Sequence, residues 1–423
     1  MTSRPRFTFH LPLPAFALAT LGLLIMIATA PGLAQTFTVL HTFTDGADGA
    51  DPFAGVTVGG TGTLYGTTYA GGGSPRYGVV FELAQRGPGW TLSPLYEFHG
   101  SDGLGPEAPV TVGPNGALYG TTTFGGNGNG TGTVFELRPP ATVCPTPICY
   151  WSETVLHSFN GYDGALPDDV QLVFDQAGNI YGTTVVGGAY GDGTVFELTP
   201  SGEGWTESVL HNFNDNRIDG YEPYFGVISD RAGNLYGTTD LGGTAGNAGG
   251  GTVFELSPSG ATWTESILYD FPLDNLGGTS NPGALIMDRF GNLYGTTSDA
   301  GENDGSLFEL TPSDGGWIFS TLYSFVNSCY PAGLVMDTAG NFYGNCDTGG
   351  RHGEGMVFKL TNSGGSWTLT DLHDFTCGSD GCQPQGAPAL DASGNLYGTT
   401  VVGGNLSDCS DNPGCGTVWE ITP

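Results

Sequence analysis

The sequence predicts an all-β protein, a seven-bladed β-propeller of four-stranded antiparallel blades, and three observations support this fold class. The first is a tandem repeat, in which a Leu-Tyr-Gly-like triplet returns seven times at intervals of 49 to 62 residues. The second is the composition of each repeat, which holds four short runs of β-branched and aromatic residues. The third is a single strand at the start of the repeats that supplies what the last repeat lacks.

The triplet is centred on one tyrosine in each repeat. These tyrosines are Tyr65, Tyr119, Tyr181, Tyr236, Tyr294, Tyr343 and Tyr397. A period of this size indicates units that bury their apolar faces against their neighbours. Outside residues 1–34 no segment has a sustained apolar pattern of helical period, so residues 35–423 are predicted to form one domain built of strands.

The fourth repeat shows the predicted blade most clearly, with strands expected over residues 224–229, 234–239, 252–256 and 263–269. Asp230 opens the turn between the first two strands and Gly233 closes it, the pattern of a type I turn followed by a glycine with positive φ. One Asp and one Asn per turn fall short of the ligand set of calcium, so these turns are interpreted as structural. A sheet with two apolar faces then packs radially into a propeller.

The two ends of the repeats predict how the ring closes. Residues 37–43 match the fourth strand of a blade but have no other strands before them, whereas the last repeat ends after its third strand, residues 417–421. The first run therefore completes the last blade, and closing the ring in this way removes two exposed sheet edges.

The first 34 residues differ from the repeats. Arg4 and Arg6 precede an apolar run over residues 15–30, and the segment ends in Gly32-Leu33-Ala34. This composition predicts a signal peptide, cleaved before Gln35, and hence a secreted or periplasmic protein. A retained membrane anchor is the alternative, and the run is short for a spanning helix.

The chain is strongly acidic, with a formal net charge of −32. This charge disfavours nucleic acid and anionic membranes as partners. Eight cysteines behind a signal peptide predict disulfides formed in an oxidising compartment. The topology suggests the pairs Cys144–Cys149, Cys329–Cys346, Cys377–Cys382 and Cys409–Cys415. Zinc is the alternative, but these spacings are not the two-residue gaps typical of zinc sites.

Comparison among the repeats assigns structural roles to two series of polar residues. One position of the fourth strand alternates between histidine and tyrosine, which indicates a packed ring with one hydrogen bond rather than a metal ligand or general base. Its occupants are His41, Tyr96, His157, His211, Tyr269, Tyr323 and His373. A glutamate of the third strand is interpreted as a repeated hydrogen bond, with a charged pore as the alternative. Lys359 replaces this glutamate in the sixth repeat and is expected to pair with a glutamate of an adjacent blade.

Function is expected on one face of the ring. The loops after the second strand and after the fourth strand share this face and vary in length, and variable loops on a rigid scaffold often carry function. The ligand-face candidates are Asp102, Asp163, Asp168, Asp219, Arg351 and His352. Aspartates beside glycine carbonyls suit calcium, while loops rimmed by aromatic residues suit sugars; solvated turns are the third interpretation. No catalytic residue, metal ligand set or cofactor site is identified.

Three blocks of the repeat resemble a known family. Asn-Leu-Tyr-Gly-Thr-Thr, Gly-Thr-Val-Phe-Glu-Leu and Val-Leu-His-x-Phe are similar to the GloVer-type (Gloeo/Verruco) tandem repeats of bacterial extracellular proteins. The resemblance covers nearly all of residues 37–423 and implies export and a repeat architecture, without any catalytic residue. Many members have a C-terminal anchoring segment that this sequence lacks, so free secretion is expected.

These observations lead to two hypotheses of function. The first is a secreted, monomeric, non-enzymatic binding scaffold whose acidic, glycine-rich loop face takes a glycan or protein ligand. The alternative is a glycan-active hydrolase or lyase that uses loop carboxylates. Glycoside hydrolysis requires two acids about 5 to 9.5 Å apart across the bound sugar, a distance that no sequence gives.

Overall fold

The computed structural model describes Met1 and residues 35–423, except 127–128, 141–149, 203, 245–248, 261, 273–280, 299–304, 327–328, 406, 408 and 410–412. Residues 35–423 form one compact unit. The predicted signal peptide lies outside the described residues, apart from Met1. Among the residues that are described, no helix is long and apolar enough to cross a membrane.

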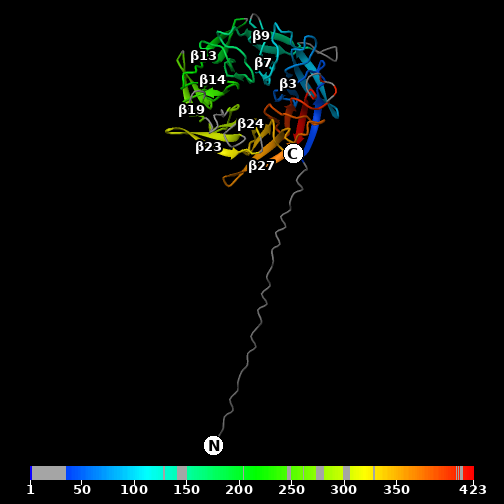
Figure 1. The fold of residues 1–423 in the computed structure, drawn as a ribbon, viewed down its shortest axis with the longest axis vertical. Coiled ribbons are helices and arrows are strands. Elements are labelled where there is room, and N and C mark those ends of the chain that lie inside the picture. Colours follow the sequence, from blue (N-terminus) through cyan, green and yellow to red (C-terminus); the bar gives the residue numbers. More distant parts are fainter. Residues whose placement is uncertain are drawn as a thin grey trace. The chain divides into compact units, whose positions relative to one another are not determined.

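Seven four-stranded antiparallel sheets in the described part form the blades of a propeller, as predicted (Figure 1). In blades 1 to 6 the strands run outward from the ring axis in chain order, whereas the outer strand of blade 7 is β1, the first strand of the chain. Blade 1 consists of β2 (Thr57–Val58), β3 (Leu64–Thr68), β4 (Val79–Arg86) and β5 (Gly89–Glu97), and blade 2 of β6 (Thr111–Val112), β7 (Leu118–Thr122), β8 (Thr133–Arg138) and β9 (Ser152–Ser158). Blade 3 consists of β10 (Val173–Phe174), β11 (Ile180–Thr184), β12 (Thr194–Ser201) and β13 (Gly204–Asn212), and blade 4 of β15 (Ile228–Ser229), β16 (Leu235–Thr239), β18 (Thr252–Ser259) and β19 (Thr262–Asp270).

Blade 5 consists of β20 (Ile286–Met287), β21 (Leu293–Thr297), β22 (Ser306–Ser313) and β23 (Gly316–Ser324), and blade 6 of β24 (Pro331–Met336), β25 (Phe342–Cys346), β26 (Met356–Ser363) and β27 (Ser366–Asp374). Blade 7 consists of β28 (Ala389–Leu390), β29 (Leu396–Thr400), β30 (Thr417–Thr422) and β1 (Thr36–Thr42). A small extra sheet pairs β14 (Gly220–Tyr221) with β17 (Leu241–Gly242).

The ring closes as the sequence predicted. β1 pairs antiparallel with β30, from Thr36 opposite Thr422 to Thr42 opposite Thr417. The ring of Phe37 stacks on His373 of blade 6, with ring centroids 3.6 Å apart. Phe43, the residue directly after β1, is fully buried. The N-terminal strand is therefore both the outer strand of blade 7 and part of the packing between blades 6 and 7.

The turns between first and second strands have the predicted bulged form. In blade 4 the amide of Asp230 donates to the carbonyl of Asn234 at 3.0 Å, and Gly233 has a φ of 89°. The Asp230 carboxylate accepts hydrogen bonds from the amides of Ala232 and Asn234. The Asp230 carboxylate thus forms these hydrogen bonds within its own turn, which confirms that this aspartate stabilises the turn.

The first strand of blade 4 is shorter than predicted. β15 contains only Ile228–Ser229, whereas the sequence suggested residues 224–229. Gly226 lies against the backbone of Gln171 in blade 3, and a Cβ at Gly226 would be 2.5 Å from the Gln171 carbonyl oxygen. The chain near the axis therefore contacts the neighbouring blade instead of extending its own sheet, which leaves Tyr224 free of the strand.

The Leu-Tyr-Gly triplet builds the contact between blades. A Cβ at Gly237 would lie 2.5 Å from the ring of Phe254, so only glycine allows the third strand's phenylalanine to fill this space. Tyr236 is buried in a cluster with Leu285, Leu293 and other residues of blade 5. Gly237 thus permits close packing within blade 4, and Tyr236 fills the seam toward blade 5.

A glycine before each third strand contacts a proline of the next blade. All seven glycines have positive φ, and a Cβ on any of them would come within 2.5 to 3.0 Å of the proline Cδ. The pairs are Gly78–Pro106, Gly132–Pro167, Gly193–Pro223, Gly251–Pro282, Gly305–Pro331, Gly355–Pro384 and Gly416–Pro52. Because this contact recurs in every blade, it places the residue after each proline at the same position relative to the axis.

The sixth blade replaces the usual Thr-Thr by Asn345-Cys346 and keeps the contact that the first threonine makes with the next blade. Thr238 donates a hydrogen bond to Gly283 of the next blade, and the Asn345 side chain makes the equivalent bond to the carbonyl of Gly386 at 2.6 Å. Cys346 forms a disulfide with Cys329.

Three of the four suggested disulfides are confirmed. They are Cys329–Cys346, Cys377–Cys382 and Cys409–Cys415. The fourth suggested pair, Cys144 and Cys149, lies outside the described residues.

Candidate functional site

The residues that follow the seven repeated prolines line one pocket on the ring axis. They are Phe53, Glu107, Asp168, Tyr224, Gly283, Ala332 and Gln385. The pocket has a volume of about 370 Å³, and we refer to it as the axial pocket. One residue from every blade reaches it, so its lining differs from repeat to repeat although the scaffold does not.

The axial pocket opens on the predicted loop face. Isolated β-bridges join the loop after a fourth strand to the segment after a second strand, as between Ala50 and Ala70 or between Leu104 and Phe124. These two sets of loops therefore share one face of the ring, as expected. A second cavity of about 460 Å³, lined by the first strands, shares Asp169, Phe225 and Ala332 with the pocket and continues it along the channel.

Five carboxylates line the axial pocket, and no lysine, arginine or histidine is found among its described lining residues. The five are Glu107, Asp168, Asp169, Asp240 and Asp347. Aromatic rings of Phe53, Tyr224, Phe225 and Tyr330 share the lining. The pocket is therefore a negatively charged, partly aromatic cavity.

Burial raises the pKa of four carboxylates of the pocket, Glu107, Asp169, Asp240 and Asp347. Burial, and then a hydrogen bond with Asp168, raises the pKa of Glu107 to about 9, so Glu107 keeps its proton at neutral pH. Burial and the charge of Asp168 raise the pKa of Asp169 to about 7. Burial and the charge of Glu222 raise the pKa of Asp240 to about 6. This crowding of negative charge favours the entry of a cation.

One oxygen of the pocket has no partner among the described residues. Burial raises the pKa of Asp347, and its Oδ1 is buried without a hydrogen bond. A buried carboxylate oxygen that lacks a donor costs free energy, so a ligand donor at this position would be stabilising.

Of the six candidates from the sequence, the structure places Asp168 in the axial pocket. Asp102, Asp163 and Asp219 instead accept hydrogen bonds from the alternating histidine and tyrosine position of the fourth strand. Tyr96 donates to Asp102 at 2.5 Å, and the Nε2 atoms of His157 and His211 lie 3.2 Å from Asp163 and Asp219. These contacts confirm the interpretation of a packed ring with one hydrogen bond.

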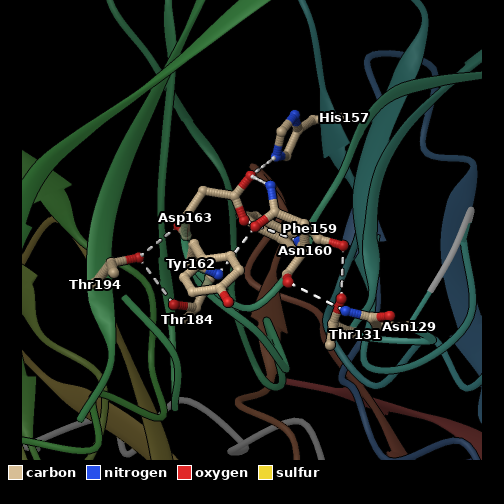
Figure 2. Close-up of polar contacts among 9 residues, drawn as sticks. All are labelled: Asn129, Thr131, His157, Phe159, Asn160, Tyr162, Asp163, Thr184 and Thr194. Atoms are coloured by element: carbon tan, nitrogen blue, oxygen red, sulfur yellow. Dashed lines mark hydrogen bonds and ion pairs between the residues drawn. The ribbon is translucent and has the colours of Figure 1, made fainter. Parts of the chain in front are cut away.

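Figure 2 shows the environment of Asp163. Its carboxylate faces the imidazole of His157 and also accepts a hydrogen bond from the backbone amide of Asn160, at 2.9 Å. These bonds hold the loop that leads from blade 2 to blade 3. Tyr162 in the same loop is exposed, as the interpretation of a sugar-stacking rim requires.

Arg351 and His352 lie outside the axial pocket. Both are exposed, and the Arg351 guanidinium pairs with Asp374, with Nε 3.4 Å from Oδ2. The structure therefore does not bring these two bases together with Asp168.

The profile of the Gloeobacter/Verrucomicrobia repeat matches residues 22–148 and 149–329 of the chain. The chain belongs to this repeat family. A search of curated proteins gives no match.

Solved structures similar to this repeat protein show the fold alone. A streptogramin B lyase structure is 13% identical with a TM-score of 0.55, over 92% of this chain and 97% of the lyase chain. The aldose sugar dehydrogenase of Streptomyces coelicolor is 13% identical with a TM-score of 0.40, over 93% and 100% of the two chains. The NanB sialidase of Streptococcus pneumoniae is 12% identical with a TM-score of 0.42, over 91% and 70%.

The glutamates of the third strands have the structural role expected for the repeat. The hydroxyl of the triplet tyrosine donates to the glutamate of the same blade in five blades, at 2.6 to 3.2 Å. The pairs are Tyr119–Glu136, Tyr181–Glu197, Tyr236–Glu255, Tyr294–Glu309 and Tyr397–Glu420. The expectation for Lys359 was wrong. Its ammonium lies 5.0 Å from the ring centroid of Tyr343 in its own blade, where the missing glutamate would be.

Sequence reasoning missed Asp240 and Asp347 in the axial pocket. Both directly follow the second strand of a blade. In blades 1 to 3 the same position is occupied by Tyr69, Thr123 and Val185. A comparison of the repeats at this one position would have found them, because acids alternate there with uncharged residues.

Sequence reasoning also missed three glutamates of the fourth strands, Glu153, Glu207 and Glu265. Burial raises the pKa of Glu153 and of Glu207 to about 7, and burial with Asp219 nearby raises that of Glu265 to about 8. Two of the three form clusters with a histidine and an aspartate. A further group, Glu354 with Cys377 and Cys382, is unsuited to a metal because the two cysteines form a disulfide.

Proposed function

We propose that this repeat protein is an exported, non-enzymatic binding protein whose ligand inserts a positively charged group into the axial pocket. The observation that carries the proposal is the set of five carboxylates contributed by different blades, without a cationic side chain among the described lining residues. The strongly acidic chain adds a long-range field that attracts cations to this face.

An arginine side chain of an extracellular peptide or protein fits the pocket best. A guanidinium donates planar pairs of hydrogen bonds to carboxylates and also stacks on aromatic rings. Asp168 and Asp169 are neighbours in the lining, and Tyr224 and Phe225 supply the rings. The volume of about 370 Å³ accommodates a side chain, whereas a folded partner would rest on the surrounding loops.

Location outside the cytoplasm supports this partner class. Three disulfides in the described residues favour an oxidising compartment. Export through a signal peptide over residues 1–34 is part of the proposal, as is a monomer with no nucleic-acid or membrane partner.

A glycan-active hydrolase or lyase is the second candidate, and one observation favours it. Glu107 keeps its proton near neutral pH while hydrogen-bonded to Asp168, so a protonated acid and a carboxylate lie side by side. This pair is closer than the roughly 5 to 9.5 Å that glycoside hydrolysis requires across a sugar. The binding function therefore explains the pocket better.

The test uses the purified protein of residues 35–423 and two tripeptides. Tri-arginine and tri-citrulline have similar shapes and differ in charge. Isothermal titration calorimetry should detect tri-arginine binding that weakens as salt increases, and no tri-citrulline binding. Product analysis on a panel of glycans in parallel tests the second candidate.

Variants locate the binding site. Asp168→Asn and Asp169→Asn should each weaken tri-arginine binding roughly 10- to 150-fold, since a charged hydrogen bond contributes about 1.5–3 kcal/mol. Asp215→Asn is the matched control because Asp215 is exposed on the same face and does not line the pocket. Equal losses in all three variants would contradict the proposal. Glycan turnover removed by Glu107→Gln would replace it with the second candidate.

A further inference from the structure

One position of the fourth strand decides what fills the gap between adjacent blades. Its occupants around the ring are Phe37, Leu92, Glu153, Glu207, Glu265, Phe319 and Leu369. Phe37 stacks on His373 at 3.6 Å, and Phe319 stacks on Tyr269 at 3.9 Å. Apolar residues can therefore close this gap, and the three glutamates are not required by the fold.

Between blades 3 and 4, a glutamate at this position joins a histidine and an aspartate. His211 comes from β13, Asp219 from the loop that follows it, and Glu265 from β19 of the next blade. The Nε2 atom of His211 lies 3.2 Å from Asp219 Oδ2 and 3.6 Å from Glu265 Oε1. One ligand atom from each residue lies within 4.8 Å of the others.

This cluster leaves buried oxygens without donors. Asp219 is only 6% exposed, and its Oδ1 has no hydrogen bond among the described residues. The buried Glu265 Oε1 has no hydrogen bond within the described part either, and its contact with His211 Nε2 is a longer ion pair of 3.6 Å. Two carboxylates that share a partly dry gap with one imidazole repel each other when both are ionised, and a cation bound between them would relieve this repulsion.

The histidine and aspartate do not explain the glutamate. His41 with Asp48 and His373 with Asp380 make the same contact, at 3.0 and 3.3 Å, in blades whose gap holds no glutamate. The loop is therefore held by two residues of the cluster, and the third has no structural task that the other blades share.

We propose that His211, Asp219 and Glu265 bind a divalent transition-metal ion of the zinc type. Zinc lies about 2.0–2.1 Å from histidine nitrogen and 2.0–2.2 Å from carboxylate oxygen, which separates ligand atoms in a tetrahedron by about 3.4 Å. The observed 3.2 and 3.6 Å match this separation. Water would supply the fourth ligand, and the ion would clamp blade 3 to blade 4.

A second site of the same kind lies between blades 2 and 3. His157 Nε2 is 3.2 Å from Asp163 Oδ2 (Figure 2), and Glu207 completes the group, with Oε1 buried and without a hydrogen bond. The strand-four histidines were interpreted as structural because tyrosine replaces them elsewhere. A histidine that pairs only with its aspartate has this structural role, whereas His157 and His211 also face a glutamate of the next blade.

The gap between blades 1 and 2 provides an internal control. There Glu153 faces Asp102 across Tyr96, whose hydroxyl donates to Asp102 at 2.5 Å. A protonated phenol is a poor zinc ligand compared with imidazole. We expect this third group to bind no zinc, although it has the same two carboxylates.

The test measures zinc bound to residues 35–423 after EDTA treatment and dialysis. Calorimetry and elemental analysis should give two zinc ions per chain. Glu265→Leu and Glu207→Leu should each remove one ion, and the double variant both, while Glu153→Leu should retain two. Leucine occupies the equivalent position in blades 1 and 6, so these variants should fold. Glu265→Gln keeps the shape and should weaken its site roughly 100-fold or more, beyond the effect of an outer-shell change.

Thermal unfolding gives an independent readout. Zinc should raise the Tm of the wild-type protein and leave that of the double variant unchanged, because only a ligand that binds the folded state stabilises it. Failure of the wild-type protein to bind zinc would overturn the inference. So would a stoichiometry that is the same in the wild type and the double variant, or calcium that displaces zinc at equal concentration.

Discussion

The closing strand gives the strongest test of the ring, and its contribution can be worked out from the structure. A chain that starts at Thr44 lacks β1 and Phe43. It loses the pairing of β1 with β30 and exposes β30 as an edge. Phe43 is fully buried beside Phe81 of blade 1, with ring centroids 5.4 Å apart.

The expected loss is a large part of the total stability. Removal of a buried phenylalanine side chain costs about 3–5 kcal/mol, and the half-buried Phe37 adds roughly 1–2 kcal/mol. Folded domains are stable by only about 5–15 kcal/mol. We therefore expect the truncated chain to be largely unfolded or to associate through β30 at 25 °C.

Urea unfolding followed by near-ultraviolet circular dichroism compares the chains that start at Gln35 and at Thr44. A synthetic peptide of residues 35–43, added in excess, should restore the transition of the truncated chain. The same peptide with Phe37→Ala and Phe43→Ala should not. Equal urea midpoints for the two chains would refute the closed ring, since β1 would then be a loose tail.

Three other changes test separate parts of the structure. Burial raises the pKa of Glu153 from 4.5 to about 7, so the folded state binds the extra proton and the free energy of unfolding falls as pH rises through this range. Glu153→Leu should remove the part of this slope that one proton contributes and add roughly 1–3 kcal/mol at pH 8, measured by urea unfolding at pH 5 and pH 8; parallel pH profiles of the variant and the parent would contradict the cause. Gly237→Ala places a Cβ 2.5 Å from Phe254 and should cost about 1–3 kcal/mol, whereas an unchanged Tm would show that this contact within blade 4 relaxes freely. Replacing Cys329 by Ala and Cys346 by Thr opens a 17-residue loop and should cost about 3 kcal/mol; insensitivity of the parent Tm to reductant would argue against this disulfide.

Local patterns were sufficient to predict the fold. The spacing of Asp230 and Gly233 fixes a turn through bonds within five residues, and the match between residues 37–43 and a fourth strand required only comparison of the repeats. The partner of Lys359 was predicted wrongly because the glutamate that it replaces would have contacted Tyr343 of the same blade. The lysine ammonium contacts that ring instead, and so it needs no glutamate from an adjacent blade.

The candidate site was less accessible from the sequence. Asp168 was identified as an acid of a variable loop, but its neighbours in the pocket come from blades far apart in the chain. Asp240 and Asp347 are single residues after strands that otherwise look alike. Such residues can be placed together only when the order of the blades around the axis is known. Loop composition alone does not distinguish them from Asp102 or Asp163, whose carboxylates form hydrogen bonds within their own loops and with the preceding strands.

A crystal structure of residues 35–423 with bound tri-arginine tests the proposed binding function most directly. We expect a guanidinium in the axial pocket, within hydrogen-bond distance of Asp168 or Asp169 and in contact with the aromatic lining. A peptide held only by exposed loop acids such as Asp215, with no guanidinium on the axis, would contradict the account.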